Sequence, residues 1–239
     1  MKAKKQGAVI YAAIFSALMA FSAGSCGFLP EEENPETVSV GKDSELVQEI
    51  NFDSGSMKLV WSDEFDYSGV PDTSKWKYQT GRGDNGWGNS ELQYYISNES
   101  EAKTAVVENG MLKIKAYNED GVWKSARMNS KQSWKYGFIE ARMKITDKKG
   151  AWPAFWMMPQ ESVYGPWPKS GEIDIMENAP STCGDHTVFS TLHAEGHSGG
   201  NGKSIGNKDM GANLSNEWHS FAVKWDSEEI TAYYDGVAQ

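Results

Sequence analysis

The sequence predicts an all-β fold, a sandwich or jelly roll of two antiparallel sheets. Three observations predict it: short runs alternate apolar and polar residues, glycine-rich turns separate these runs, and no long apolar stripe has the 3.6-residue period of a helix. The 239 residues suffice for one large domain of this kind.

The alternating runs give individual strands at residues 112–116, 139–145 and 219–225, and residues 230–234 form another. Asn109-Gly110 precedes the first run and Asp235-Gly236 follows the last. Such pairs favour hairpin turns, because both turn positions adopt positive φ. Residues 237–239 are too few for a return strand of typical length. We therefore expect a domain that is truncated at its C-terminus.

Residues 1–25 have the layout of a secretory signal peptide. Lysines within residues 2–5 precede an apolar run over 8–23, which is too short and wrongly flanked for a stable membrane span. An uncleaved anchor helix is the alternative. Ala23-Gly24-Ser25-Cys26 resembles a bacterial lipoprotein cleavage site, so Cys26 is expected to carry a lipid and to be the only membrane attachment.

The expected location is therefore outside the cytoplasm, as an outer-membrane or cell-surface lipoprotein, with a periplasmic or secreted protein as the alternative. Residues 26–56 are rich in Glu, Ser, Pro and Asn and are expected to form a flexible acidic tether. Residues 57–239 carry the strand pattern and are expected to form the folded domain.

The net charge and the aromatic content of the chain narrow the range of functions that it could have. The formal charge of −10 argues against binding nucleic acid, which needs clustered positive charge. Aromatic residues make up 12% of the chain and include ten Trp. Flat aromatic faces in such number are typical of clefts that bind sugars.

Three acidic residues lie close together at Glu172, Asp174 and Glu177. In a strand, Glu172 and Asp174 share one face, but strict alternation would turn Glu177 into the core, where an unpaired carboxylate is costly. A one-residue bulge at Met176 would return Glu177 to the face of Glu172. The alternative is an exposed acidic strand face without a catalytic role.

The spacing also suits acid–base chemistry. With the bulge, the two glutamates lie roughly 13 Å apart along the backbone, at about 3.3 Å per residue. Long side chains on a concave sheet can close much of this gap toward the roughly 5–5.5 Å between the carboxyls of retaining glycosidases. Asp174 lies between them, where it can hydrogen-bond one Glu and hold their pKa values apart.

The motif Glu-x-Asp-x-x-Glu, preceded by Trp-Pro-x-Ser-Gly, resembles glycoside hydrolase family 16 in its laminarinase-like (endo-β-1,3-glucanase) branch. Further segments match that pattern in order, and the resemblance spans about residues 57–239. These segments are residues 59–65, 86–95, 125–127, 136–142 and 152–157.

This resemblance implies a concanavalin-like β-jelly-roll sandwich of two antiparallel sheets with a concave substrate groove. It makes residues 57–239 a catalytic domain that lacks its C-terminal strands. It implies a retaining, endo-acting mechanism with Glu172 as nucleophile, Glu177 as general acid/base and Asp174 as the assisting residue. The implied substrate is laminarin-type β-1,3-glucan or mixed β-1,3/1,4-glucan, and the protein is expected to act as a monomer.

The resemblance also implies groove residues. Trp152, Trp156 and Trp167 would be sugar platforms, although Trp156 could equally pack in the core. Asn89 and Arg127 would hydrogen-bond sugar toward the nonreducing side, and His193 would line the groove. No cofactor is required, but a structural calcium is possible, with Glu64 as its candidate ligand.

Two other functions remain open from the sequence. One is a non-catalytic carbohydrate-binding jelly roll, which would need the aromatic groove but not the three acids. The other is a cupin-like metal enzyme, because His193, Glu195 and His197 would share one strand face. Glycines at positions 199, 200 and 202 instead indicate a loop at this place.

Overall fold

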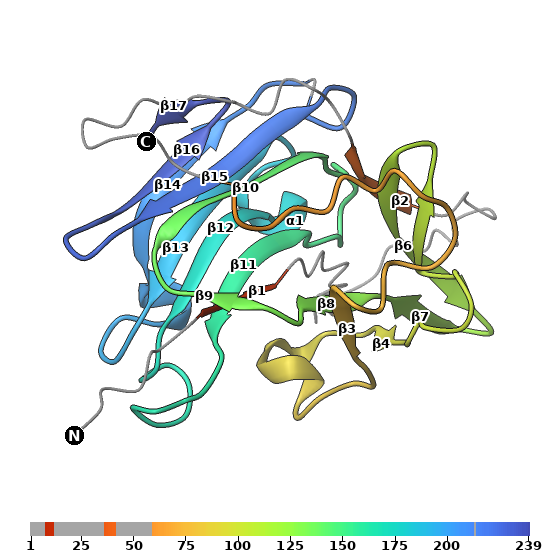
Figure 1. Ribbon diagram of the computed structural model, residues 1–239, viewed down its shortest axis with the longest axis horizontal. Coiled ribbons are helices and arrows are strands. Elements are labelled where there is room, and N and C mark those ends of the chain that lie inside the picture. Colours follow the sequence, from red (N-terminus) through yellow and green to blue (C-terminus); the bar gives the residue numbers. More distant parts are fainter. Residues whose placement is uncertain (1–7, 12–35, 42–58, 213) are drawn as a thin grey trace, which may run out of the picture.

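A computed structural model describes residues 8–11, 36–41, 59–212 and 214–239, and most of its elements are β-strands (Figure 1). The first sheet has six strands. In spatial order they are β14 (Lys203–Asp209), β13 (Thr187–His193), β12 (Glu172–Asn178), β11 (Ala154–Pro159), β1 (Ala8–Tyr11) and β9 (Ser133–Trp134). This sheet is curled and forms a groove.

The second sheet has nine strands. Eight follow one path: β17 (Val237–Ala238), β16 (Ile230–Tyr234), β15 (His219–Trp225), β10 (Gly137–Lys144), β2 (Glu36–Gly41), β6 (Met111–Glu119), β7 (Val122–Ser125) and β4 (Tyr94–Tyr95). The ninth, β5 (Ala105–Glu108), pairs with β6 outside this path. The predicted jelly-roll sandwich of two sheets is confirmed.

Smaller elements complete the fold. A third sheet pairs β3 (Trp76–Gln79) with β8 (Arg127–Ser130). The helical elements are η1 (Gly86–Ser90), α1 (Pro180–Cys183) and η2 (Gly199–Asn201). None of the helices in the described part of the chain has the length and apolarity that a membrane crossing requires.

The main core lies between the two large sheets. The first sheet contributes side chains such as Met157 and Ile175, and the second contributes Met143, Phe221 and Val223, all nearly inaccessible to solvent. Burial of a side chain of this size stabilises the fold by about 1.5–3 kcal/mol. The sheet that forms the groove is therefore packed on its inner face against the second sheet.

The strands follow the alternation of the sequence. β15 and β16 have the predicted bounds, and β6 and β10 contain the other predicted runs almost completely. Both predicted turns are present, with positive φ at Asn109 and Gly110 and at Asp235 and Gly236. After the second turn, the two-residue β17 pairs with β16.

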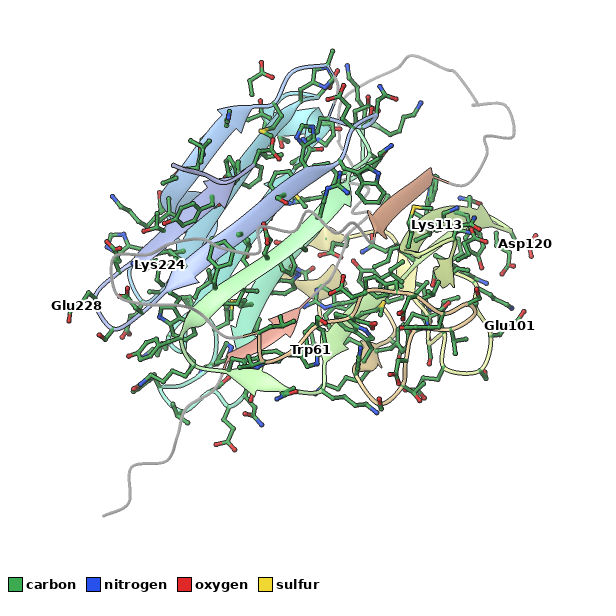
Figure 2. The ribbon with its side chains drawn as sticks, turned by 45° about the horizontal axis from the view of Figure 1, so that its top comes forward. Trp61, Glu101, Lys113, Asp120, Lys224 and Glu228 are labelled. Atoms are coloured by element: carbon green, nitrogen blue, oxygen red, sulfur yellow. The ribbon has the colours of Figure 1, made fainter. Side chains whose placement is uncertain are left out.

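Figure 2 shows charged side chains at opposite ends of the molecule, with Lys224 at one end, Asp120 at the other, and Trp61 between them. The ring of Trp61 lies edge-on to Trp76 of β3 and to Trp134 of β9, at centroid distances of 5.4 and 5.3 Å. This aromatic contact joins the small sheet to the edge of the first large sheet.

Two strands come from the ranges predicted as leader and tether. β1 lies between β11 and β9, and β2 lies between β6 and β10. A leader removed before Cys26 would take β1 with it, so this strand and a cleaved leader exclude each other in the mature protein. Cys26 lies outside the described residues, and the division into leader, tether and domain stays a prediction.

Candidate active site

The three acidic residues lie on one face of β12. Its neighbour β13 places His193, Thr191 and Phe189 opposite Glu172, Asp174 and Glu177 in that order. These partners are spaced by two residues and therefore point to the same side of the sheet. The three carboxyl groups consequently face the same side as well.

A bulge makes this possible, as predicted. Between Asp174 and Glu177, β12 has one residue more than β13, and against β11 the pairing passes from Asp174 to Met176 and skips Ile175. The irregularity thus involves Ile175 as well as the predicted Met176. Both side chains are fully buried in the main core, so the extra residue adds apolar packing while it redirects Glu177.

A hydroxyl pair satisfies the backbone at the bulge. Ser190, directly across on β13, donates its Oγ hydrogen to the carbonyl oxygen of Ile175 at 2.6 Å. Tyr234 of the opposite sheet lies 2.7 Å from the same Oγ and must therefore be the donor to it. Gly206 leaves room for this ring, since a Cβ there would lie 2.7 Å from the Tyr234 hydroxyl. The bulge is thereby tied to both sheets.

Glu177 has the properties of a proton donor. Burial is the main cause that raises its pKa well above the usual range, and the charge of Asp174 adds to it. Trp152 donates its Nε1 hydrogen to Glu177 Oε1 at 2.7 Å and acts in the opposite direction, because it favours the ionised form. The sequence had indicated Asp174 as the group that separates the pKa values of the two glutamates; for Glu177, burial has the larger effect.

Asp174 and Glu172 are joined by a hydrogen bond between their carboxyl groups. Burial, and then the charge of Glu172 and a hydrogen bond with it, raise the pKa of Asp174 well above its usual range. Asp174 therefore keeps its proton to higher pH than an ordinary aspartate, and in this form it can donate a hydrogen bond to Glu172. Nε2 of His193 lies 3.0 Å from Oδ2 of Asp174. Trp167 donates its indole hydrogen to Glu172 Oε2, so two donors can hold Glu172 as a carboxylate.

The predicted Trp residues occupy different surroundings. Trp156 pairs with Asp174 in the sheet and belongs to a second apolar cluster together with Trp152, Ala154, Tyr95, Trp87 and Met158, separate from the main core. Trp156 is 5% exposed and Trp167 is 48% exposed. Trp167 is therefore open to a ligand. Trp156 is instead buried, on the strand β11 that pairs with the acidic strand β12. Trp152 donates an indole hydrogen bond to Glu177, and Trp167 donates one to Glu172.

Arg127 packs against Trp156, whereas Asn89 contacts Glu91. The Arg127 guanidinium is stacked between two indoles, 4.4 Å from the Trp87 ring centroid and 4.7 Å from that of Trp156. Asn89, in η1, donates to Glu91 Oε1 at 3.4 Å. The structure thus brings the predicted Arg127 into contact with the same Trp156 that lies across from Asp174.

The metal-site alternative is not supported by the geometry. Ala194 and His197 exchange backbone hydrogen bonds, so β13 ends at His193 and a tight turn follows. Glu195 pairs with Lys169 at 3.0 Å, while His193 contacts Asp174. Within residues 8–11, 36–41, 59–212 and 214–239, no group of three His, Cys, Asp or Glu side chains could hold a metal ion. A structural calcium with Glu64 as a ligand stays a prediction, because calcium also takes backbone carbonyl oxygens as ligands.

The sequence did not indicate one buried group of residues near the site. Glu91, Gln93 and Tyr95 are almost wholly buried, with Glu91 5% exposed, and they hydrogen-bond one another. Their period-two spacing beside Asn89 was a signal that could have placed them on one face. The sequence nevertheless could not show that this face is buried.

Comparisons with known proteins show the family to which the chain belongs. Residues 90–239 match the family described as glycosyl hydrolases family 16. A β-glucanase of Rhodothermus marinus is 40% identical over 185 residues, which are 74% of this chain and 63% of that protein. A glucan endo-1,3-β-glucosidase of Cryptopygus antarcticus is 38% identical over 190 residues, covering 75% of this chain and 67% of the relative.

A solved structure shows the same fold. The laminarinase from Rhodothermus marinus superposes with a TM-score of 0.68 at 37% identity, over 76% of this chain and 72% of that one. By sequence, the chain spans 63% of the length of the curated Rhodothermus relative.

Proposed function

Because the chain belongs to glycosyl hydrolases family 16, we propose that it is an endo-acting, retaining glycoside hydrolase of β-glucans. Its substrate is laminarin-type β-1,3-glucan or mixed β-1,3/1,4-glucan. The observation that carries the proposal is the arrangement on β12, where three acids share one face through a bulge. Of these, Glu177 holds its proton to unusually high pH.

In the first step, the Glu172 carboxylate attacks the anomeric carbon from the α face. The bond to the leaving oxygen breaks, and Glu177 donates its proton to that oxygen. The product is a covalent glycosyl ester of Glu172. Trp167 and Asp174 hydrogen-bond Glu172 and hold it in place before the attack.

In the second step, Glu177, now ionised, takes a proton from a water molecule that attacks the same carbon. Two inversions at this carbon give net retention. In its protonated form, which its raised pKa favours, Asp174 donates to Glu172 instead of repelling it. These steps use only side chains of the chain and need no cofactor.

The names of the relatives support the substrate. One is called a β-glucanase and another a glucan endo-1,3-β-glucosidase. A non-catalytic carbohydrate-binding protein would need Trp167 but neither the bulge nor a protonated Glu177. The acidic groups therefore favour the enzyme.

The test uses a panel of laminarin, mixed-linkage glucan and sulfated galactan, with proton NMR of the first reducing ends. We expect cleavage of the glucans with the β-anomer appearing first. An α-anomer appearing first would mean inversion and would overturn the roles of Glu172 and Glu177. Binding of laminarin without any cleavage would instead identify a binding module.

We also propose that the protein is an exported monomer held at the outer membrane by a lipid on Cys26. The leader pattern supports this proposal. Mass spectrometry of protein extracted from membranes should find residue 26 as a lipidated N-terminus. An intact N-terminus that retains residues 8–11 would contradict it and would favour the pairing of β1.

A further inference from the structure

Outside the catalytic group, the acidic residue Glu91 is buried, at 5% exposed. Its Oε2 accepts hydrogen bonds from Gln93 Nε2 and from the Tyr95 hydroxyl, the latter at 3.1 Å. Its Oε1 accepts one from Asn89 Nδ2 at 3.4 Å. The surrounding donors are therefore directed at both carboxylate oxygens.

The backbone around Glu91 is also held closely. Gly86 has a φ of 58°, and a Cβ there would lie 2.5 Å from the backbone nitrogen of Glu91. That nitrogen donates to the Gly86 carbonyl at 3.2 Å. The loop that precedes Glu91 is thereby folded tightly against it, which limits how far its carboxylate can move.

Glu91 lies next to the stacked arginine. The charge of Arg127 acts on the Glu91 carboxyl, and Arg127 itself lies between Trp87 and Trp156. Its Nε also donates to Gln79 Oε1 at 2.5 Å. Tyr95, which donates to Glu91, lies edge-on to Trp87 at a centroid distance of 5.9 Å. Since Trp156 pairs with Asp174 in the sheet, a chain of contacts runs from Glu91 through Tyr95, Trp87 and Arg127 to the catalytic face.

We propose that Glu91 is a positioning residue for the proposed hydrolase: its carboxylate fixes Asn89 and the Trp87–Arg127–Trp156 stack, and so sets the affinity of the groove for the glucan chain. Glu91 does not touch the reacting atoms. Its ionised form holds Arg127 by charge and accepts three hydrogen bonds, whereas its protonated form loses the charge attraction.

The role of Glu91 can be measured because its carboxyl group gains or loses a proton near neutral pH. Burial raises the pKa of Glu91 to about 7, against the opposing effects of Arg127, Asn89, Gln93 and Tyr95. Of the groups facing it, Arg127 on β8 stays charged, and burial keeps Tyr95 on β4 neutral by raising its pKa. Asn89 and Gln93 are neutral amides. Glu91 is thus the group of this cluster that changes charge near neutral pH.

The first experiment measures binding without cleavage. In a Glu172→Gln background, the affinity for a β-1,3-linked glucose hexasaccharide is followed by calorimetry from pH 6 to pH 8. We expect Kd to fall about three- to tenfold as Glu91 ionises. Adding Glu91→Gln should keep the weaker affinity at every pH, because the amide cannot ionise.

The second experiment separates positioning from general stability. In the enzyme with an intact nucleophile, Glu91→Gln should raise KM at pH 8 about three- to tenfold and remove the pH dependence of KM, with a smaller effect on kcat. Glu140→Gln is the matched control, since burial also raises the pKa of Glu140, which lies on β10 of the opposite sheet. This control should leave the pH dependence of KM unchanged.

Three outcomes would overturn the inference. The first is a Kd that does not change with pH in the Glu172→Gln protein, and the second is a pH dependence of Kd or KM that remains after Glu91→Gln. The third is a Glu140→Gln protein in which KM also loses its pH dependence. The first needs no variant at Glu91, so a folding defect of Glu91→Gln cannot hide it. The inference rests on the proposed function, but the two can fail separately. Binding that depends on pH without hydrolysis would reject the hydrolase and keep the role of Glu91.

Discussion

Replacing Glu172 with Ala is expected to lower kcat on β-glucan by about 10⁴-fold or more, the largest effect of any single substitution in this protein. Without the carboxylate, no covalent glycosyl ester forms. The remaining groups, with Glu177 still protonated, cannot supply a nucleophile at the α face. The residual rate measured on laminarin, with protein folding checked by circular dichroism, tests this expectation.

Azide makes the prediction specific to Glu172. The small anion fits the space left by the side chain and attacks the anomeric carbon from the α face, while Glu177 protonates the leaving group. Azide should therefore restore activity and give an α-glycosyl azide, which NMR identifies. A β-glycosyl azide from the Glu172→Ala protein would place the nucleophile elsewhere and contradict the assignment.

Glu177→Ala is expected to lower kcat on glucan by about 10²–10⁴-fold, because general acid catalysis typically contributes this much. An aryl glycoside with a good leaving group needs little protonation and should lose much less in the first step. Azide should again accelerate turnover, now with a β-glycosyl azide as product. Equal losses on glucan and on the aryl glycoside would refute the role of Glu177 as proton donor.

The pH profile gives a further check on the same residue. Since the pKa of Glu177 is raised, its acid form persists as pH rises, and loss of this proton gives the alkaline limb of kcat. Once Asp174 is ionised, its charge adds to the raised pKa of Glu177, so Asp174→Asn should move the alkaline limb to lower pH and leave partial activity. Glu177→Ala should abolish this limb. A limb unchanged in both variants would assign it to another group.

Much of the fold could be predicted because alternation is a local property. The runs at 219–225 and 230–234 became β15 and β16 with the same bounds, since one face of each meets the core. The bulge on β12 could also be predicted, because burying Glu177 among isoleucines would cost more than inserting one residue. Its exact partner residues could not, as they depend on the register of both neighbouring strands.

The site was predicted less completely, for a physical reason. Glu91 belongs to a segment that was noticed for its resemblance, but its role depends on Arg127, which is distant in sequence. Ser190 and Tyr234, which secure the bulge, are 44 residues apart and come from opposite sheets. The turn after His193 broke the apparent strand pattern of His193, Glu195 and His197. Contacts between distant segments leave no pattern in a short stretch of sequence.

The bulge has a consequence for how this strand tolerates change. Exchanging Ile175 or Met176 for another apolar side chain alters packing but keeps the length of the strand. Deleting either residue instead reverses the side on which Glu177 and everything after it emerge, and it places the Ser190 hydroxyl opposite a different carbonyl. Length is therefore a stricter requirement here than identity. A library of variants built around β12 should vary the apolar side chains at these two positions and never their number.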